Sequence, residues 1–320
     1  MPTVSVIIPN YNHARFLRQR IDSVLSQTYR DFEVFVLDDE SADGSRQVLE
    51  AYVGHPQVAM RLSHTNSGST FAQWNKGVKL AQGKYVWLAE SDDFADNTFL
   101  ERLVPVLDQH PGAALVKTRS LKVDEEGHHI PNTVEDPATR DWREDFVIDG
   151  EEDCRLQLEH GNSISNASAV LFRRQVYLDV GGADESFRMC GDWLLWAKMM
   201  MEGDFAYCAE PLNRYRYHEG SVRSACLTNG IRDIEDLKVY RYLLSNLAIP
   251  PDEASRVCNR IVKRWIGRAI ALSGNRIPFV RNREILRLLR EIDNQYVWHI
   301  CKQVFLKGVS GGIRCCSGAK

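Results

Sequence analysis

VSVIIPNYN (residues 4–12) and FEVFVLDDE (residues 32–40) together decide the expected fold of this chain. Each segment begins with a short apolar run that is typical of a buried β-strand, and each ends in polar residues. Between them, residues 15–27 carry apolar side chains at helical spacing. The stretch therefore predicts a strand, a helix and a second strand that lies parallel to the first in one sheet.

The same alternation of strands and helices continues as far as residue 118. Further strands are predicted at 58–63, 85–90 and 113–118. Helices are predicted from Asp43 or Ser45 to Tyr52, at 69–81 and at 97–109. Because strands that alternate with helices through short links pair in parallel, we expect an α/β fold with a mostly parallel sheet flanked by helices.

The rest of the chain is less regular. Residues 121–160 are polar and are expected to form an irregular loop over the site. Order returns with a strand at 168–174, a helix at 193–202 and a short strand at 209–218, and the pattern is helical after Ser224. We therefore expect one α/β domain at 1–224 and a helical, basic C-terminal region at 225–320.

Composition and charge exclude several classes of protein. The chain has 320 residues, is 44% hydrophobic and carries a formal net charge of -3, which argues against disorder and against a globally basic nucleic-acid binder. No apolar run is long enough for a membrane-spanning helix, and the N-terminal run reads as a strand rather than a signal peptide. Eight cysteines without a CxxC pair favour reduced thiols and a cytoplasmic location.

The C-terminal region differs from the rest in charge. From Arg256 onward there are 14 Lys and Arg residues against 3 Asp and Glu residues. Around residues 260–270 and 283–292, basic side chains flank apolar helical stripes. A helical subdomain with a solvated basic face explains this pattern. Peripheral contact with the inner face of the membrane, which would suit a lipid-linked acceptor, and a homodimer interface are the alternatives.

Carboxylates gather after two of the predicted strands. LAESDDF (88–94) places Glu90, Asp92 and Asp93 together, and adjacent carboxylates repel one another unless a cation or hydrogen bonds compensate. Mn²⁺ and Mg²⁺ commonly link such carboxylates to substrate phosphates. Asp38 and Asp39 follow the second strand, where they could bind a base or ribose. The structural alternative for the carboxylates at 90–93 is a helix cap. For Asp38 and Asp39 it is a solvated turn.

Four segments, in order, resemble the inverting family 2 glycosyltransferases, which have a GT-A fold. The opening stretch from VSVIIPNYN to DDESADGS resembles the start of that family, and NSGSTFAQWNKGVKLAQGKYVWLAESDD resembles the segment that leads to its DxD-type metal motif. FRRQVYLDVGGADESFRMCGDWLLWAKMM is similar to the region of its catalytic base, and RYRYHEGSVRS to its closing motif. The resemblance covers residues 3–224.

The resemblance implies a role for each matching residue. Pro9, Tyr11 and Asp39 would line the nucleotide-base pocket, with Asp38 nearby. Asp92 would contact the ribose and the metal region, with Asp93 as the other candidate metal ligand. Asp192 would be the catalytic base, with a helix cap as its structural alternative, and His218 would contact metal or phosphate. The chain departs from the family pattern at Trp74, Glu90 and Gly191, where many relatives have Arg, Asp and Glu.

The expected function is therefore inverting transfer of a sugar from a nucleotide-diphosphate donor to an acceptor hydroxyl. The expected donor is a UDP-sugar. The expected metal is Mn²⁺ or Mg²⁺, the acceptor is a glycan or a lipid-linked molecule, and the setting is cell-surface polysaccharide or glycan assembly. A metal-dependent nucleotidyltransferase and a noncatalytic sugar-nucleotide-binding module are the alternatives. A dinucleotide-binding oxidoreductase is rejected because PNYNHARF, after the first strand, contains no glycine.

Overall fold

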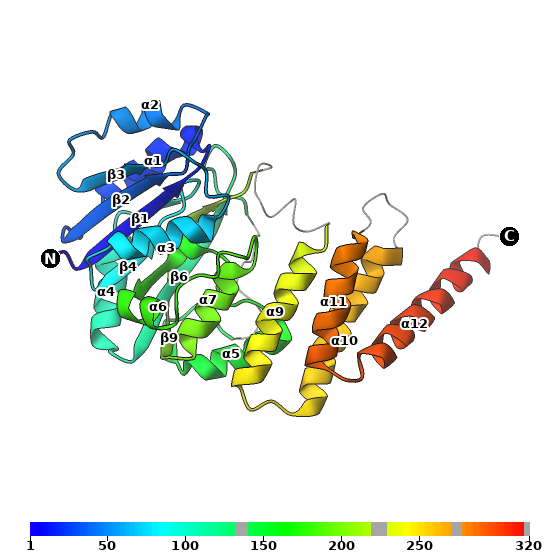
Figure 1. Ribbon diagram of the computed structural model, residues 1–320. Coiled ribbons are helices and arrows are strands. Elements are labelled where there is room, and N and C mark those ends of the chain that lie inside the picture. Colours follow the sequence, from blue (N-terminus) through cyan, green and yellow to red (C-terminus); the bar gives the residue numbers. More distant parts are fainter. Residues whose placement is uncertain (132–139, 219–228, 271–276, 317–320) are drawn as a thin grey trace. The chain divides into compact units, whose positions relative to one another are not determined.

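The computed structural model describes residues 1–131, 140–218, 229–270 and 277–316, without the side chains of 268–270 and 307–316. The chain divides into two compact units, residues 1–219 and 220–320 (Figure 1). Each unit is described by itself. The predicted boundary at residue 224 falls between 219 and 228, outside the described residues.

The first unit is built on one mixed sheet whose strand order is β3-β2-β1-β4-β8-β6-β9-β5, with β7 paired to β9. The strands are β1 (Val4–Asn10), β2 (Phe32–Asp38), β3 (Val58–Leu62), β4 (Tyr85–Leu88), β5 (Phe94–Ala95), β6 (Ala113–Val123), β7 (Phe146–Ile148), β8 (Val170–Arg173) and β9 (Asp204–Arg216). β1 pairs in parallel with β2 and β4, while β8 is antiparallel to both β4 and β6. Since β9 is parallel to β6, the strands β1, β2, β4, β6 and β9 all run in one direction.

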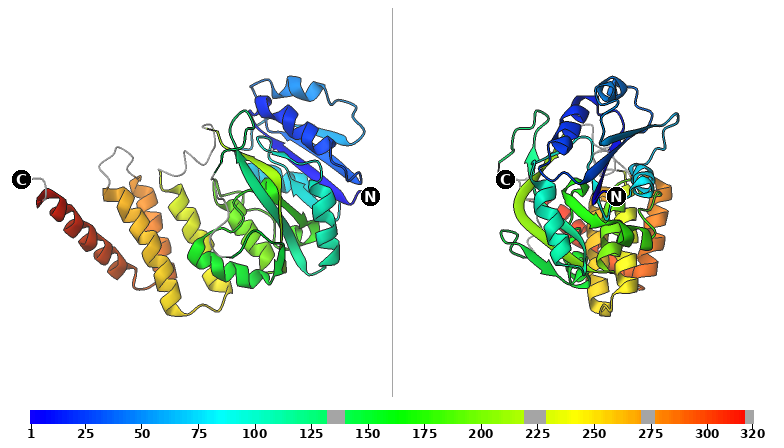
Figure 2. Two further views of the ribbon diagram at one scale, coloured as in Figure 1. Left: turned by 180° about the vertical axis from the view of Figure 1, so that it is seen from behind. Right: turned by 90° about the vertical axis from the view of Figure 1, so that its left-hand side faces the viewer.

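Helices cover both faces of this sheet (Figures 1 and 2). They are α1 (Ala14–Leu25), α2 (Ser45–Glu50), α3 (Thr70–Leu80), α4 (Phe99–Gln109), α5 (Gly150–His160), α6 (Arg174–Asp179) and α7 (Gly191–Met200). The apolar spacing of α1 buries Leu17, Ile21 and Val24 against the sheet. The predicted α/β class with a mostly parallel sheet is confirmed.

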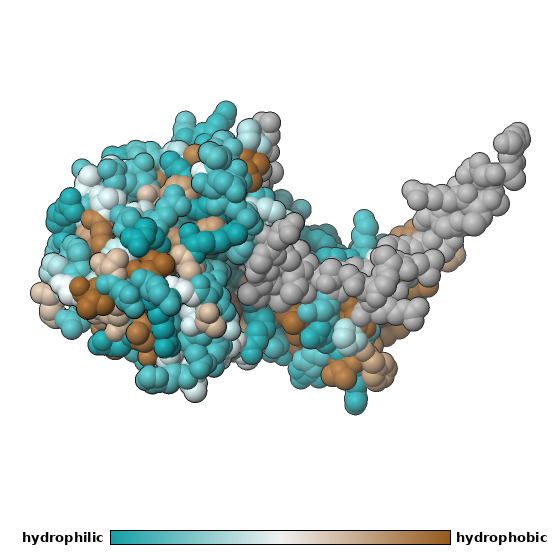
Figure 3. Space-filling model, turned by 90° about the horizontal axis from the view of Figure 1, so that it is seen from above, coloured by the Kyte–Doolittle hydropathy of each residue, from teal (hydrophilic) through white to brown (hydrophobic). Residues whose placement is uncertain are grey.

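The core of the first unit lies between the sheet and its helices. Every side chain of β1 and β4 is buried, which explains why these strands read as continuous apolar runs rather than alternating ones. Trp87 of β4 stacks on Phe99 of α4 with ring centroids 4.1 Å apart. On the face shown in Figure 3, hydrophobic side chains of this unit form separate patches within a hydrophilic surface.

Residues 121–160 do not form the single irregular loop that the sequence suggested. β6 continues to Val123, β7 follows at Phe146–Ile148, and α5 occupies Gly150–His160, while residues 132–139 lie outside the described part. The buried positions of α5 keep helical spacing but include Asp153 and Gln157. Because its buried face is partly polar, this helix has no continuous apolar stripe, and hydrophobic periodicity does not indicate it.

The described residues of the second unit form four helices: α9 (Ile231–Asn246), α10 (Pro251–Ile270), α11 (Phe279–Ile292) and α12 (Tyr296–Cys316). The apolar stripe of α10 is buried, with Ile261, Trp265 and Ile266 at most 7% exposed. Arg264 binds the buried Asp233 and Asp236 of α9, so an ion triad joins these two helices. No helix in the described residues is long and apolar enough to cross a membrane.

Candidate active site

The site is assembled at one edge of the sheet, where the parallel strands end. Asn10 ends β1 and Asp38 ends β2, and the two are register partners across the sheet. The acidic turn Glu90–Asp93 follows β4, and His218 follows β9. Because these strands run in the same direction, side chains from distant parts of the sequence meet at this edge.

Asp92 lies at the centre of a cluster with two histidines. Its Oδ2 is 3.1 Å from Nε2 of His218, and His218 is buried. One candidate ligand atom each from His13, Asp92 and His218 lie within 4.8 Å of one another. The Nδ1 atom of His13 is 2.8 Å from the Ser91 hydroxyl, which fixes the orientation of that ring. The structure thus brings together Asp92 and His218, as predicted, and adds His13.

Two arginines hold the backbone of the acidic turn. Arg20 of α1 is fully buried, and its Nε donates to the carbonyl of Glu90 at 2.8 Å. Arg216 at the end of β9 donates from its Nε to the carbonyl of Asp92 at 2.7 Å. Both guanidinium groups therefore fix the turn through its main chain and supply positive charge beside three carboxylates.

Asp93 points away from this cluster and into the protein. It is 2% exposed, its Oδ1 accepts from the backbone N–H of Arg216 at 2.9 Å, and its Oδ2 accepts from Asn166 at 3.0 Å. Asp93 therefore ties the acidic turn to β9. Its oxygens are directed to these internal donors rather than to the two histidines.

Glu90 and Trp74, two of the three departures from the family pattern, are direct partners. The indole N–H of Trp74 donates to Oε1 of Glu90 at 2.6 Å. Trp74 itself is buried in α3 and packs edge-on against Phe71. The longer Glu side chain is thus held by a hydrogen bond that the Trp provides, and the two departures explain one another.

The three carboxyl groups differ in pKa because their surroundings differ. Burial and the neighbouring Asp92 raise the pKa of Glu90 to about 8. Burial and Asp92 also raise the pKa of Asp93. For Asp92, burial acts in the same direction, but the hydrogen bond from His218 and the charges of His13 and His218 outweigh it and lower the pKa. Asp92 is therefore the most readily ionised of the three carboxyl groups.

The donor set of the cluster fits a divalent transition-metal ion. Mg²⁺ takes oxygen ligands almost exclusively, whereas imidazole nitrogen is a common ligand of transition metals. Two imidazoles and one ionised carboxylate therefore suit Mn²⁺ better than Mg²⁺. Burial lowers the pKa of His13, which keeps that imidazole neutral and its lone pair available.

The residues expected to bind the nucleotide lie at the ends of β1 and β2. Asp39 is buried, and it accepts hydrogen bonds from the N–H and hydroxyl of Ser67 and from Gln73 at 2.7–3.1 Å. Asp38 is fully buried and accepts from Asn10 at 2.8 Å, so it joins β1 to β2. Pro9 is also buried in β1, whereas Tyr11 is 50% exposed.

Asp192 lies in the first turn of α7 and is half-buried. The N-cap position belongs to Cys190, whose side chain makes no capping hydrogen bond, so Asp192 is the second residue of the helix rather than its cap. Gly191, the third departure from the family pattern, has a steric reason. A Cβ atom there would lie 2.6 Å from two ring atoms of Phe71.

A buried network of polar side chains holds α7 in place. The indole N–H of Trp193 donates to Oε1 of Gln157 at 2.5 Å, and the amide of Gln157 donates to Asp153 at 2.8 Å. Asp153 also accepts from Ser163 at 2.6 Å and forms an ion pair with Arg140. The helix that carries Asp192 is therefore oriented by directional bonds as well as by apolar packing.

Sequence reasoning missed His13, Arg20 and Gln73. His13 stands two residues beyond Tyr11, after the first strand, so its place at a strand end was a usable signal. Arg20 occupies a buried position of a helix whose stripe is otherwise apolar, and Gln73 lies on the buried face of α3. No local pattern distinguishes these two from solvated residues.

Comparisons with known proteins identify the family of this chain. The family model described as glycosyl transferase family 2 matches residues 5–181, which is more than half of the chain. An uncharacterised glycosyltransferase of Rickettsia prowazekii is 27% identical over 237 residues, covering 74% of this chain and 70% of that protein. Chondroitin synthase of Escherichia coli is 35% identical over 133 residues, covering 41% of this chain but 19% of the synthase.

Solved structures show the same fold at low sequence identity. Residues 1–349 of TarS from S. aureus, in complex with UDP-GlcNAc, superpose with a TM-score of 0.65 at 17% identity, over 92% of this chain and 81% of that one. A mannosyltransferase from Pyrobaculum calidifontis, in complex with GDP-Man and Mn²⁺, gives a TM-score of 0.57 at 16% identity, over 97% and 86%. The predicted GT-A fold is confirmed.

Proposed function

The chain belongs to glycosyl transferase family 2, and from this membership we propose that it is an inverting, metal-dependent hexosyltransferase. In this proposal, the enzyme moves a sugar from a nucleotide-diphosphate donor onto an acceptor hydroxyl. The observation that carries the proposal is the cluster of Asp92, His218 and His13 at the carboxyl edge of the sheet, where the Asp92 carboxylate faces two imidazoles.

The donor would bind along the ends of β1 and β2. Asp39, held in place by Ser67 and Gln73, would accept a hydrogen bond from the base or ribose, and the exposed ring of Tyr11 would cover the base. Pro9 would form the floor of this pocket, and Asp38, which accepts a hydrogen bond from Asn10, would hold the ends of β1 and β2 together. A uridine donor is supported by the complex of TarS with UDP-GlcNAc, although the mannosyltransferase binds GDP-Man.

Asp92, His218 and His13 would hold Mn²⁺, or with weaker complementarity Mg²⁺. When bound, such an ion neutralises negative charge on the departing diphosphate. Asp93 would act in a different way, because its hydrogen bonds to the Arg216 N–H and to Asn166 fix the turn that presents Asp92. We therefore choose Asp92 over Asp93 as the carboxylate ligand.

Asp192 would take the proton of the acceptor hydroxyl while the hydroxyl oxygen attacks the anomeric carbon. The carbon–oxygen bond to the diphosphate breaks in the same step, so the configuration at the anomeric carbon inverts. The half-buried position of Asp192 leaves it accessible to an acceptor, while Trp193 and Gln157 hold the helix in place. The first turn of a helix also stabilises the ionised form that a base requires.

The test measures donor binding and slow donor hydrolysis across a panel of UDP-, GDP- and TDP-sugars with Mn²⁺ or Mg²⁺. We expect one donor to bind in a metal-dependent way, and Asp192→Asn to lower turnover by roughly 10²- to 10⁴-fold while donor affinity is kept. Asp179→Asn, an exposed residue of α6, is the matched control.

The products distinguish the alternatives. Release of nucleoside diphosphate supports a glycosyltransferase, whereas release of pyrophosphate would establish a nucleotidyltransferase. Binding without turnover, after acceptors of several classes have been supplied, would establish a noncatalytic sugar-nucleotide-binding module.

The acceptor and the setting stay predictions. A glycan or lipid-linked acceptor, and a role in cell-surface polysaccharide or glycan assembly, follow from the family resemblance. Peripheral membrane contact or homodimer formation through the basic helices is supported by exposed apolar side chains of the second unit, among them Phe279, Trp298 and Phe305. Co-flotation with anionic vesicles and light scattering would test these two possibilities.

A further inference from the structure

A second cluster of potential metal ligands lies in the helical unit. It combines Cys258 of α10, Asp293 directly after α11 and His299 of α12, and one candidate ligand atom from each lie within 4.8 Å of one another. Cys258 is fully buried, and the side chains of His299 and Asp293 are 4% and 8% exposed. The three residues belong to three successive helices or their ends, so one ion could join all three segments.

The hydrogen bonds of His299 leave one ring nitrogen without a partner. Its Nε2 lies 2.9 Å from Oδ2 of Asp293 and 2.9 Å from the hydroxyl of Ser255. Its Nδ1 is buried and has no hydrogen-bond partner among the described residues. When Nε2–H donates to Asp293, the Nδ1 lone pair is buried and unpaired, which is unfavourable for a histidine that serves packing alone.

The chemistry of the three groups selects one class of ion. A thiolate, an imidazole and a carboxylate are the usual ligands of Zn²⁺. Soft thiolate ligands select Zn²⁺ over Mg²⁺ and Mn²⁺, so the sulfur of Cys258 discriminates against the ions proposed for the first unit. Three protein ligands leave the fourth position of a tetrahedral ion open.

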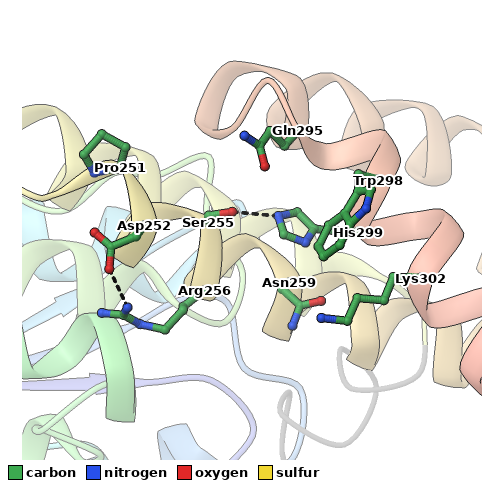
Figure 4. Close-up of a pocket in the computed structure, with 9 residues that line it drawn as sticks. All are labelled: Pro251, Asp252, Ser255, Arg256, Asn259, Gln295, Trp298, His299 and Lys302. Atoms are coloured by element: carbon green, nitrogen blue, oxygen red, sulfur yellow. Dashed lines mark hydrogen bonds and ion pairs between the residues drawn. The ribbon is translucent and has the colours of Figure 1, made fainter.

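A pocket adjoins the cluster at His299. The pocket has a volume of about 490 Å³ and is lined by residues of α10 and α12, including Ser255, Asn259 and His299 (Figure 4). Figure 4 shows the imidazole of His299 directed toward Ser255 in its wall. Lys302 and Arg256 also line the pocket, so a water molecule or a small anion could occupy the fourth position.

We propose that Cys258, Asp293 and His299 form a zinc site that joins α10, the end of α11 and the start of α12. Binding forms a zinc–sulfur bond, and the thiol proton of Cys258 passes to solvent. The ion would bind the Nε2 atom of His299 that faces Asp293, and it would fix α12 against α10. The site does not depend on the proposed transferase activity.

The test uses the full-length protein after removal of metal by a chelator, in the Asp92→Asn background so that the first cluster does not contribute. Titration with Co²⁺ should produce a thiolate-to-cobalt charge-transfer band and the visible bands of a tetrahedral ion, with one equivalent bound. Zn²⁺ should displace the cobalt and raise the melting temperature.

Cys258→Ser should abolish the charge-transfer band and weaken Zn²⁺ binding by at least roughly 100-fold, and His299→Gln should weaken it similarly. Cys301→Ser, which changes an exposed cysteine of α12, should leave both unchanged. If circular dichroism shows that Cys258→Ser does not fold, the test uses His299→Gln, which keeps the thiol of Cys258. The proposal is overturned if the folded Asp92→Asn protein shows no thiolate band, or if the band disappears with Cys301 instead.

Discussion

Two histidine–aspartate pairs in this molecule have similar distances between their side chains but different surroundings. Nε2 of His218 lies 3.1 Å from Asp92, and Nε2 of His299 lies 2.9 Å from Asp293. The first pair stands at the end of parallel strands, with a second imidazole and two further carboxyl groups near it. The second pair stands at a corner between helices, with a thiol as its third member.

The difference shows how the surroundings select the chemistry of an ion site. Strand ends that converge on one sheet edge leave room for a substrate, and nitrogen and oxygen donors there suit an ion that contacts phosphate. Helices that pack on one another enclose a buried sulfur, which suits zinc. By our two proposals, the same pair of residue types therefore serves a substrate in one unit and architecture in the other.

The largest effect is expected from Asp92→Asn. Loss of the carboxylate that faces the two histidines should weaken Mn²⁺ binding by roughly 100-fold or more and reduce transfer in parallel. Zn²⁺ binding in the helical unit should stay unchanged. Mn²⁺ affinity can be followed by electron paramagnetic resonance, with Asp93→Asn for comparison. If Asp93→Asn weakens Mn²⁺ more than Asp92→Asn does, the choice between the two carboxylates is wrong.

Arg264→Met should destabilise the helical unit by about 3 kcal/mol, because it removes the cation that joins the buried Asp233 and Asp236. Donor binding in the first unit should be unaffected. Urea unfolding combined with hydrogen exchange, read separately for α9 and α10 and for the sheet, measures both effects. Arg256→Met, in an exposed pair on the same helix, is the control, and an equal loss there would contradict the prediction.

Gly191→Ala should destabilise the first unit by about 2 kcal/mol, since the added methyl group would overlap the ring of Phe71 at the start of α7. Denaturant unfolding monitors the loss. Combination with Phe71→Leu should recover part of it, because the smaller side chain removes the ring atoms that the methyl group meets. Simple additivity of the two losses would argue against the contact as the cause.

The smallest effect is expected from Trp74→Phe, at about 1 kcal/mol of stability, because the variant removes the hydrogen bond to Glu90 and keeps an aromatic ring in the core. Metal affinity should change less than in Asp92→Asn. Thermal unfolding and Mn²⁺ titration give the two values, and Trp298→Phe on the exposed face of α12 is the matched control. A loss of metal binding as large as that of Asp92→Asn would show that Glu90 is itself a ligand.

Much of the fold could be predicted from the sequence because the strands are short and uniformly apolar. β1 was expected at 4–9 and is observed at Val4–Asn10, and the second and third strands agree similarly. The chief error is α5, whose buried face carries Asp153 and Gln157. Hydrophobic periodicity could not detect a helix that is held by polar bonds to Trp193 and Ser163.

The sequence by itself determined the alternation of elements, the identity of the reactive side chains and the order of the four motifs. It did so because apolar periodicity and residue chemistry are local properties. Only the tertiary structure decided which side chains meet. It turned Asp93 inward to Arg216, left Asp92 facing His218 and brought His13 beside both. Neighbours in the sequence can point in opposite directions, and strand pairing joins residues that no local pattern connects.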